Sequence, residues 1–328
     1  MYRFPFPAFP NGWFRVAFSD ELPPKAIKTL HYFGKDLVLF RTEDGKPHVF
    51  DAHCPHLGAH LGFGGRVEGN NLRCPFHGWC FDSHGQCVEV PYATTKVTPK
   101  TKMQSWHTRE VNGTIMIYHH LQGEAPTWEI PEMPEYSSPD WLVLKRTCWK
   151  MRSHPQELAE NGLDIAHMPY VHEQAMLEIN SQAVEIEGIK LIHRMYPKYQ
   201  MYFGTKKLGA KVDCSHDIVY YGLGHLSNYV RVQKKIDIGL VIVFFPTPID
   251  EEYIEVHGVF IMKKVWTKTV TKILAIKMIQ NFELTINQDI PIWENKIYRH
   301  EPILCGGDGS IKQFRHWASQ FYSVTLVP

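Results

Sequence analysis

Short apolar runs, separated by turn residues, fill the first third of the chain. We expect strands over residues 36–41 and 47–50 around the Glu43-Asp-Gly45 turn, because two β-prone runs joined by such a turn form a hairpin. Further strands are expected over 67–72, 79–82 and 114–118. Closely spaced short strands of this kind predict a small all-β sandwich or barrel.

The rest of the chain combines helical periodicity with long apolar runs. A Pro-rich, acidic stretch over 124–135 suits neither a helix nor a sheet and predicts a linker. Beyond it we expect a helix from Pro155 to about His167, strands from Ala183 to Phe260 and a helix from Lys268 to Tyr298. A block of strands with helices at its ends predicts an α+β domain with an antiparallel sheet. The predicted boundaries are 1–122 for the first domain, 123–140 for the linker and 141–328 for the second domain.

Composition narrows the possible functions. The 328 residues include 35 basic and 34 acidic side chains, and this balance argues against general nucleic-acid binding, which needs a basic excess. The sequence has neither an apolar run long enough to span a bilayer nor a signal peptide at Met1. We therefore expect a soluble cytoplasmic protein. The 19 histidines and seven cysteines, four of the latter between residues 54 and 87, favour metal binding over disulfides.

A first candidate metal site lies in two similar loops. Cys54 and His56 belong to one loop, and Cys74 and His77 belong to the other. A zinc finger takes its two cysteines first and both histidines from one helix, whereas here each loop supplies one thiolate and one imidazole. This arrangement suits a [2Fe-2S] cluster of the Rieske type, with both cysteines on one iron and both histidines on the other. The alternatives are a structural zinc site or four unrelated residues.

A second candidate site follows the predicted linker. If the helix runs through His167, then Asn161, Asp164 and His167 lie along one face, three residues apart. Pro169 is expected to break the helix, so that His172 turns back toward the same metal ion. Two histidines and one carboxylate form the facial triad of non-heme Fe(II), which leaves positions open for dioxygen.

The carboxylate of this triad must come from another part of the chain. Our candidate is Asp289, in the late segment Asn287-Gln-Asp289-Ile-Pro-Ile-Trp-Glu294. Glu283 and Glu294 lie close to it in the sequence and remain as competitors.

With these two motifs in order, the whole chain resembles the Rieske non-heme iron oxygenases. The flanking segments Pro10–Trp13, Asp51–Leu61, Cys87–Tyr92 and Gln288–Lys296 resemble the steroid branch of that family. This branch includes the oxygenase component of 3-ketosteroid 9α-hydroxylase and the cholesterol 7-desaturases. The resemblance implies an N-terminal all-β Rieske domain followed by a helix-grip-like catalytic domain, whose antiparallel sheet is flanked by helices.

The resemblance also implies a reaction and its partners. A sterol or steroid C–H bond would be oxidised with dioxygen, by C7 desaturation, ring hydroxylation or C4-methyl oxidation. The alternative is a non-steroid hydrophobic substrate, such as an aromatic compound or an alkaloid. Electrons would come from an NAD(P)H-dependent reductase, with or without a ferredoxin, because the chain lacks a dinucleotide-binding motif. Asp164 matches the carboxylate that bridges two subunits of this family, which implies a homotrimer.

Two further features bear on the substrate and on location. A basic, amphipathic stretch over 263–279 fits either a solvated helix packed on the sheet or a peripheral contact with an anionic membrane. The second half is also rich in large apolar side chains, which would suit either a hydrophobic cavity or an ordinary core: Tyr196, Tyr199, Tyr202, Phe203, Tyr220, Tyr221, Tyr229, Phe244 and Phe245.

Overall fold

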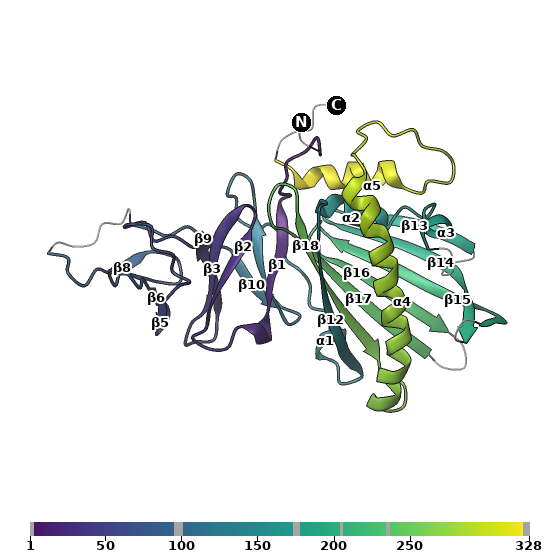
Figure 1. Ribbon diagram of the computed structural model, residues 1–328, viewed down its shortest axis with the longest axis horizontal. Helices are drawn as coiled ribbons and strands as arrows, with labels where there is room; N and C mark the ends of the chain where they lie inside the picture. Colours follow the sequence, from purple (N-terminus) through teal and green to yellow (C-terminus); the bar gives the residue numbers. More distant parts are fainter. Residues whose placement is uncertain (1–2, 95–100, 173–177, 204–205, 234–236, 324–328) are drawn as a thin grey trace. The chain divides into compact units, whose positions relative to one another are not determined.

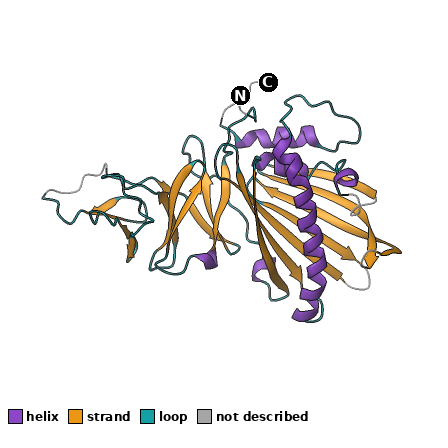
Figure 2. Ribbon diagram, in the orientation of Figure 1, coloured by secondary structure: helices purple, strands orange, loops and turns teal. Residues whose placement is uncertain are grey.

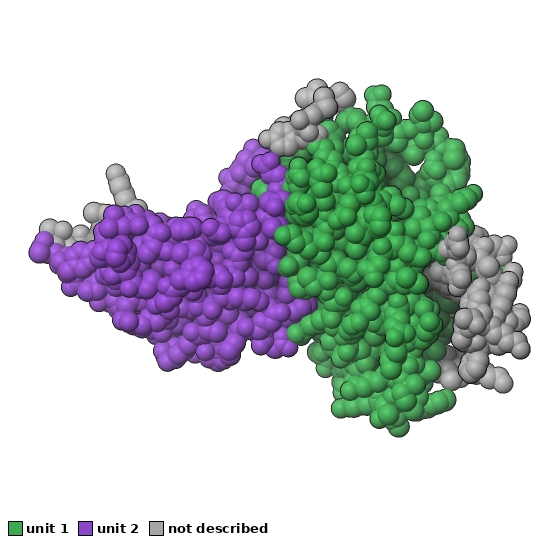
Figure 3. Space-filling view, viewed as in Figure 1, with its two compact units in different colours: residues 1–10, 133–246, 252–328 green, residues 11–132, 247–251 purple. Residues whose placement is uncertain are grey.

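The computed structural model describes residues 3–94, 101–172, 178–203, 206–233 and 237–323. The chain divides into two compact units (Figure 3). After the resemblance described above, we call residues 11–132 and 247–251 the Rieske unit, and residues 1–10, 133–246 and 252–328 the catalytic unit. The predicted second domain begins at residue 141. The structural division also assigns the first ten residues of the chain to that unit.

The Rieske unit consists of three small sheets, as the spacing of short strands predicts. Their strand orders are β1-β11-β10, β2-β3-β4-β9 and β5-β6-β7-β8. The strands are β1 (Gly12–Phe18), β2 (Ile27–Tyr32), β3 (Lys35–Arg41), β4 (Pro47–Asp51), β5 (Arg66–Glu68), β6 (Asn71–Arg73), β7 (Cys80–Phe81), β8 (Cys87–Glu89), β9 (Ser105–Trp106), β10 (Thr108–Val111) and β11 (Thr114–His119), with a 3-10 turn, η1 (Ser19–Glu21), after β1. The expected hairpin is confirmed in β3 and β4.

One predicted strand proved to be two. Residues 67–72 form most of β5 and β6, which pair with each other across a tight turn. Gly69 has φ of +61° at that turn, a backbone conformation that glycine adopts without a steric penalty. The apolar residues Val67 and Leu72 are buried on the two strands and hid the turn in the sequence pattern.

The catalytic unit is built on a seven-stranded antiparallel sheet, which confirms the predicted fold class (Figure 1). The strand order is β12-β18-β17-β16-β15-β14-β13. The strands are β12 (Trp141–Met151), β13 (Glu178–Glu187), β14 (Lys190–Phe203), β15 (Lys206–Tyr221), β16 (Leu226–Gln233), β17 (Asp237–Pro248) and β18 (Ile254–Lys263). One helical turn, α1 (Pro134–Ser137), lies within the predicted linker, and α5 (Ile311–Ala318) and the 3-10 turn η2 (Ser319–Phe321) lie near the end of the chain.

The long helix α4 (Lys268–Asn295) crosses one face of this sheet (Figures 1 and 2). Thr267 caps its start, because its side chain accepts a hydrogen bond from the Val270 N–H. The buried positions on the helix are Thr271, Ala275, Ile279, Asp289 and Trp293. Four of these residues pack or cap within the domain, whereas the fifth, Asp289, is an acidic side chain on the buried face and therefore needs a compensating partner.

The expected helix from Pro155 to His167 is wrong in its second half. The helix α2 (Pro155–Asn161) ends at Gly162, and a separate turn, α3 (Met168–Val171), begins after His167. A Cβ atom at Gly162 would lie 2.3 Å from the Tyr220 hydroxyl, so this close approach requires glycine. Asp164 then accepts hydrogen bonds from the N–H groups of Ala166 and His167 at 3.1 and 3.4 Å, which favours a turn over a helix.

The role expected for Pro169 is therefore also wrong. Pro169 lies in the first turn of α3, where its missing N–H costs nothing and its fixed φ is compatible with a helix. It starts a short helix instead of breaking a long one. His167 and His172 are the residues immediately before and after α3.

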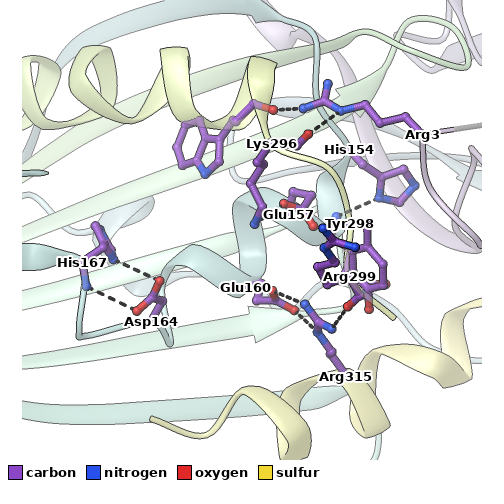
Figure 4. Close-up of polar contacts among 12 residues, drawn as sticks. Arg3, His154, Glu157, Glu160, Asp164, His167, Lys296, Tyr298, Arg299 and Arg315 are labelled. Carbon is purple, nitrogen blue, oxygen red and sulfur yellow. Dashed lines mark hydrogen bonds and ion pairs between the residues drawn. The ribbon is translucent and has the colours of Figure 1, made fainter. Parts of the chain in front are cut away.

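The N-terminal segment packs into the catalytic unit through Arg3. Its guanidinium donates to the main-chain carbonyls of Arg152 and Trp293 and to that of Lys296 (Figure 4). The buried rings of Phe4 and Phe6 join the core of the same unit. These contacts link the segment between β12 and α2 to the end of α4 and explain why this division groups the N-terminal segment with this unit.

Ionic contacts hold α2 against its neighbours. Glu160 forms a two-pronged ion pair with Arg315 at 2.6 and 2.8 Å, and Glu157 pairs with Lys296 at 2.5 Å (Figure 4). Both glutamates are buried, and a buried carboxylate that loses its partner costs several kcal/mol.

No helix in the described part of the chain combines the length and hydropathy needed to cross a bilayer.

His225 makes the stability of the catalytic unit sensitive to acid. The ring is 1% exposed, and within the described residues neither nitrogen has a hydrogen-bond partner. Burial lowers its pKa to about 4, whereas an unfolded chain protonates histidine below about pH 6.5. The unfolded state therefore binds the extra proton between these values, and the stability present above pH 6.5 is lost as the pH falls toward 4.

Lowering the pH from 7 to 5 should reduce the unfolding free energy of both proteins. We predict that this reduction is about 2 kcal/mol smaller in the His225→Phe variant than in the parent. Phenylalanine keeps the ring contacts to Phe245 and Tyr221, at 5.3 and 5.8 Å between centroids. Urea unfolding at both pH values measures the difference. The exposed His300 provides a control, because His300→Phe should leave the pH dependence unchanged. An equal loss in the parent and the His225 variant would contradict the prediction.

Two candidate metal centres

The two cysteine loops of the Rieske unit share one backbone design. The Cys54 N–H donates to the Ala59 carbonyl at 2.9 Å, and the Cys54 carbonyl accepts from Gly58 at 2.9 Å. In the second loop the Cys74 N–H donates to Trp79 at 2.8 Å, and its carbonyl accepts from Gly78 at 3.2 Å. The two loops therefore present their cysteines in matching conformations.

Both loops need glycine at the same point. Gly58 and Gly78, each four residues after the cysteine, have φ of +75° and +74°, a region that side chains with a Cβ rarely adopt. A Cβ at Gly78 would also lie 3.1 Å from Pro91 Cγ. The repeated Cys-Pro pair and the glycine therefore favour this turn, in which the cysteine is buried and the histidine lies nearer the surface.

The two predicted thiols are buried, and the two predicted imidazoles lie next to each other nearer the surface. Cys54 and Cys74 are each 3% exposed, and the rings of His56 and His77 lie 4.7 Å apart between centroids. Burial, together with the neighbouring Cys74 thiol, raises the pKa of Cys54 to about 11. Two buried thiols ionise only beside a strong positive charge, so this donor set fits an iron–sulfur cluster.

Aromatic side chains that the sequence analysis did not single out hold the outer ligands. Trp79 stacks on His56 with centroids 4.6 Å apart and rings within 7° of parallel. The Trp79 indole N–H donates to the Tyr92 hydroxyl at 2.9 Å. Leu57 and Phe76, the neighbours of the two histidines, are exposed apolar side chains. Trp79 follows the second cysteine loop and Tyr92 ends the flanking segment Cys87–Tyr92, and these positions are the sign of this role in the sequence.

The second predicted centre lies in the catalytic unit, between α3 and α4. His167 and His172 flank α3, and Asp289 comes from the buried face of α4. Asp289 Oδ1 lies 3.3 Å from His172 Nε2 and 3.8 Å from His167 Nε2. One donor atom from each residue lies within 4.8 Å of the other two, so the group could hold a metal ion.

The competing carboxylates lie elsewhere. Glu283 pairs with Lys145 at 2.6 Å, and Glu294 accepts a hydrogen bond from the Arg152 N–H at 3.3 Å. Of the three acidic residues weighed from the sequence, Asp289 is the one that faces both histidines.

Gln288 fixes the orientation of the His172 ring. The ring Nδ1 lies 3.0 Å from the Gln288 side-chain oxygen, which can only accept, so Nδ1 carries a proton. Burial opposes protonation of His172, but the hydrogen bonds to Asp289 and Gln288 outweigh it and raise the pKa. With Nδ1 bound to Gln288, Nε2 is the nitrogen that faces the Asp289 carboxylate. This arrangement fits a metal ion held between Nε2 and the carboxylate.

Asn161 contacts both remaining ligands. Its side-chain nitrogen lies 3.3 Å from Asp289 Oδ2 and 3.5 Å from His167 Nε2. Asn161 is the last residue of α2. The helix ends earlier than expected, but the Asn161 side chain still lies at the site, as predicted. The amide holds the carboxylate oxygen that faces away from His172.

Asp164 lies on the other side of His167. Its Oδ2 is 3.7 Å from His167 Nδ1 (Figure 4), and that nitrogen is buried with no hydrogen-bond partner in the described part of the chain. Burial opposes ionisation of Asp164, but hydrogen bonds from His167 and Ala166 hold its pKa below the ordinary value. The carboxylate is therefore charged and lies beside the Nδ1 edge of a candidate ligand.

The large apolar residues expected near the substrate differ in their burial. Tyr220, Phe244 and Phe245 are buried, whereas Tyr196 is exposed. Tyr220 donates to the Ala159 carbonyl at 3.2 Å and so acts as a core residue under α2. The side chains of Tyr199, Tyr202 and Phe203 lie outside the described part of the chain.

Two family descriptions match the sequence. A Rieske [2Fe-2S] domain matches residues 12–107, and a 3-Ketosteroid 9alpha-hydroxylase C-terminal domain matches residues 117–322. Cholesterol 7-desaturase nvd of Xenopus laevis is 31% identical over 97% of this chain and 72% of its own length. The probable 3-ketosteroid-9-alpha-monooxygenase oxygenase component of Rhodococcus rhodochrous is 29% identical over 96% of this chain and 80% of its own length.

Solved structures share the fold at lower identity. Dicamba monooxygenase bound to dicamba superposes with a TM-score of 0.74 at 19% identity and covers 95% of this chain and 96% of its own. The Pseudomonas putida CBB5 NdmA QL mutant with caffeine gives a TM-score of 0.75 at 18% identity and covers 93% of this chain and 88% of its own. At this identity the likeness establishes the architecture alone.

Proposed function

The chain belongs to the Rieske non-heme iron oxygenases that carry the 3-ketosteroid 9alpha-hydroxylase C-terminal domain, and from this premise we propose that it oxidises a C–H bond of a sterol or steroid. The observation that carries the proposal is the match of that C-terminal domain over residues 117–322. Relatives named cholesterol 7-desaturase and 3-ketosteroid-9-alpha-monooxygenase support the same class of substrate. The family's cofactors are a [2Fe-2S] cluster and a mononuclear iron, and its co-substrate is dioxygen.

We assign the ligands residue by residue. Cys54, His56, Cys74 and His77 would hold the cluster, because the two matching loops pair buried thiols with two neighbouring imidazoles. When bound, the two metal groups supply single electrons and activate dioxygen for C–H cleavage. A separate reductase delivers the electrons; we propose that it draws on NAD(P)H, with or without a ferredoxin. The exposed Leu57 and Phe76 beside the outer ligands support electron entry at that surface.

The mononuclear iron would be held by His167, His172 and Asp289, which supply two imidazoles and one carboxylate. Gln288 keeps His172 in the tautomer that presents Nε2, and Asn161 holds the second oxygen of Asp289. Three protein ligands leave coordination positions for dioxygen near the substrate. The positioning residues thus keep the ligand set intact while substrate and dioxygen enter.

We predict that the iron-loaded protein, supplied with a surrogate reductase system, converts cholesterol or a related steroid. Mass spectrometry distinguishes the reactions, because desaturation removes two hydrogens whereas ring hydroxylation and methyl oxidation add oxygen. The Asp289→Ala variant is the control and should give no product. Failure with cholesterol, 3-ketosteroids and C4-methyl sterols, while the cluster is reduced and reoxidised normally, would contradict the steroid assignment. Turnover of an aromatic compound or an alkaloid would then establish the alternative.

Electron transfer is proposed to pass through Asp164 in a homotrimer. The Asp164 side chain is 39% exposed while it faces His167, so it is free to contact a cluster histidine of a neighbouring subunit. Because the cluster and the mononuclear iron would then exchange electrons between subunits, the contact must repeat head to tail and close into a ring.

We predict that Asp164→Asn retains both metal centres and slows electron transfer by about 10- to 100-fold, as expected when a group that orients a ligand is lost. Stopped-flow absorbance measures how fast the reduced, substrate-bound protein reoxidises its cluster with dioxygen. Asp140→Asn, at an exposed position of the same unit, is the matched control. Parent-like reoxidation with full iron content would disprove the bridging role.

We also propose that the protein acts in the cytoplasm and touches a membrane surface with the start of α4. No cysteine in the described part of the chain forms a disulfide, which suits a reducing compartment. The large side chains of Trp266, Ile273 and Ile276 are 77%, 63% and 55% exposed, and they lie among exposed lysines such as Lys268 and Lys272. Apolar and basic side chains together favour the interface of an anionic bilayer.

Flotation with anionic vesicles tests this contact. We predict that the Lys268→Glu/Lys272→Glu variant loses at least half of the vesicle-bound fraction, since each lysine near an anionic surface contributes about 1 kcal/mol. The Lys102→Glu/Lys312→Glu variant changes the net charge equally at exposed positions elsewhere and should bind as the parent does. Equal binding by all three proteins would remove α4 as the contact.

A further inference from the structure

A second group of metal-binding side chains lies in the catalytic unit, outside the iron site. Cys148 on β12 and His257 on β18 are directly opposite each other in the antiparallel pair. Glu255 precedes His257 by two residues, so both project from the same face of β18. One donor atom from each of these three residues lies within 4.8 Å of the other two.

These side chains lie on the sheet face opposite α4. The Trp149 and Lys145 side chains of β12 contact Asn287 and Glu283 of α4. Successive side chains of a strand point to opposite faces, so the Cys148 side chain points away from α4. The strand β12 is at the edge of the sheet. Cys148 is exposed, so an ion could reach the group from solvent. The group therefore shares no residue with the site of His167, His172 and Asp289.

The contacts distinguish a metal site from a catalytic triad. His257 Nε2 lies 2.9 Å from Glu255 Oε2 and 3.5 Å from Cys148 Sγ. A nucleophile–histidine–carboxylate relay uses the two different ring nitrogens, one for each partner. Here the thiol and the carboxylate converge on the same nitrogen, as they do around a shared cation.

The spacings suit a tetrahedral zinc ion. Zinc binds cysteine sulfur at about 2.3 Å and histidine nitrogen or carboxylate oxygen at about 2.0–2.2 Å. Tetrahedral angles then place sulfur and nitrogen about 3.6 Å apart, and nitrogen and oxygen about 3.4 Å apart. The observed distances of 3.5 and 2.9 Å reach these values with small rotations of the Glu255 side chain.

We propose that Cys148, Glu255 and His257 form a binding site for Zn²⁺, in addition to the proposed function. Binding would release the thiol proton to solvent, because the thiolate is the ligand. The three protein ligands would leave a fourth position for water. An ion held between β12 and β18 would also tie the edge strand to its neighbour.

Equilibrium dialysis of the iron-loaded protein against Zn²⁺, with zinc and iron measured by mass spectrometry, tests the proposal. We expect the parent protein to gain one zinc ion per chain on dialysis, with its iron content unchanged. Cys148→Ala and His257→Gln should lose this zinc, whereas Cys305→Ala, which removes the other exposed cysteine, should retain it. Thermal unfolding midpoints establish that the variants are folded.

Thiol alkylation gives a second readout at the residue itself. Zinc should slow alkylation of Cys148 by about tenfold or more, because a coordinated thiolate is a poor nucleophile, and should leave Cys305 unaffected. Equal zinc binding by Cys148→Ala and the parent, zinc gained only as iron is lost, or unprotected Cys148 would each overturn the proposal. None of these measurements needs turnover, so the outcome is independent of the proposed steroid oxidation.

Discussion

The buried carboxylate of Asp289 is the constraint around which the catalytic unit is organised. It lies on the inner face of a 28-residue helix whose other buried positions contact the core. A charged group in that position is costly unless cations or hydrogen-bond donors face it. His167, His172 and Asn161 meet that need from a single stretch of chain between β12 and β13.

The same constraint explains why the surrounding scaffold is polar and tightly paired. Asn161, the last residue of α2, reaches Asp289 at 3.3 Å, and a Cβ atom at the next residue, Gly162, would lie 2.3 Å from the Tyr220 hydroxyl. The helix α2 is in turn held by the ion pairs of Glu157 and Glu160 (Figure 4). A chain of short contacts thus links the position of one ligand to the packing of α4, α5 and the N-terminal segment.

Local patterns in the sequence predicted most of this architecture, and tertiary contacts decided the rest. The hairpin of β3 and β4 and the long helix α4 follow from turn residues and periodicity. The need for glycine at position 162 could not be foreseen, because it comes from a tyrosine that is distant in the sequence. The choice of Asp289 over Glu294 depends on the rotational phase of α4 about its axis, and the role of Gln288 depends on the same geometry.

The most direct test of this account is the iron content of the Asp289→Ala variant beside the parent and Glu294→Ala. If Asp289 completes the ligand set, the variant keeps the two irons of the cluster, with an unchanged Rieske electron paramagnetic resonance spectrum, and loses the mononuclear iron. Glu294→Ala should keep all of its iron. Full mononuclear iron in Asp289→Ala, or its loss in Glu294→Ala alone, would contradict the account.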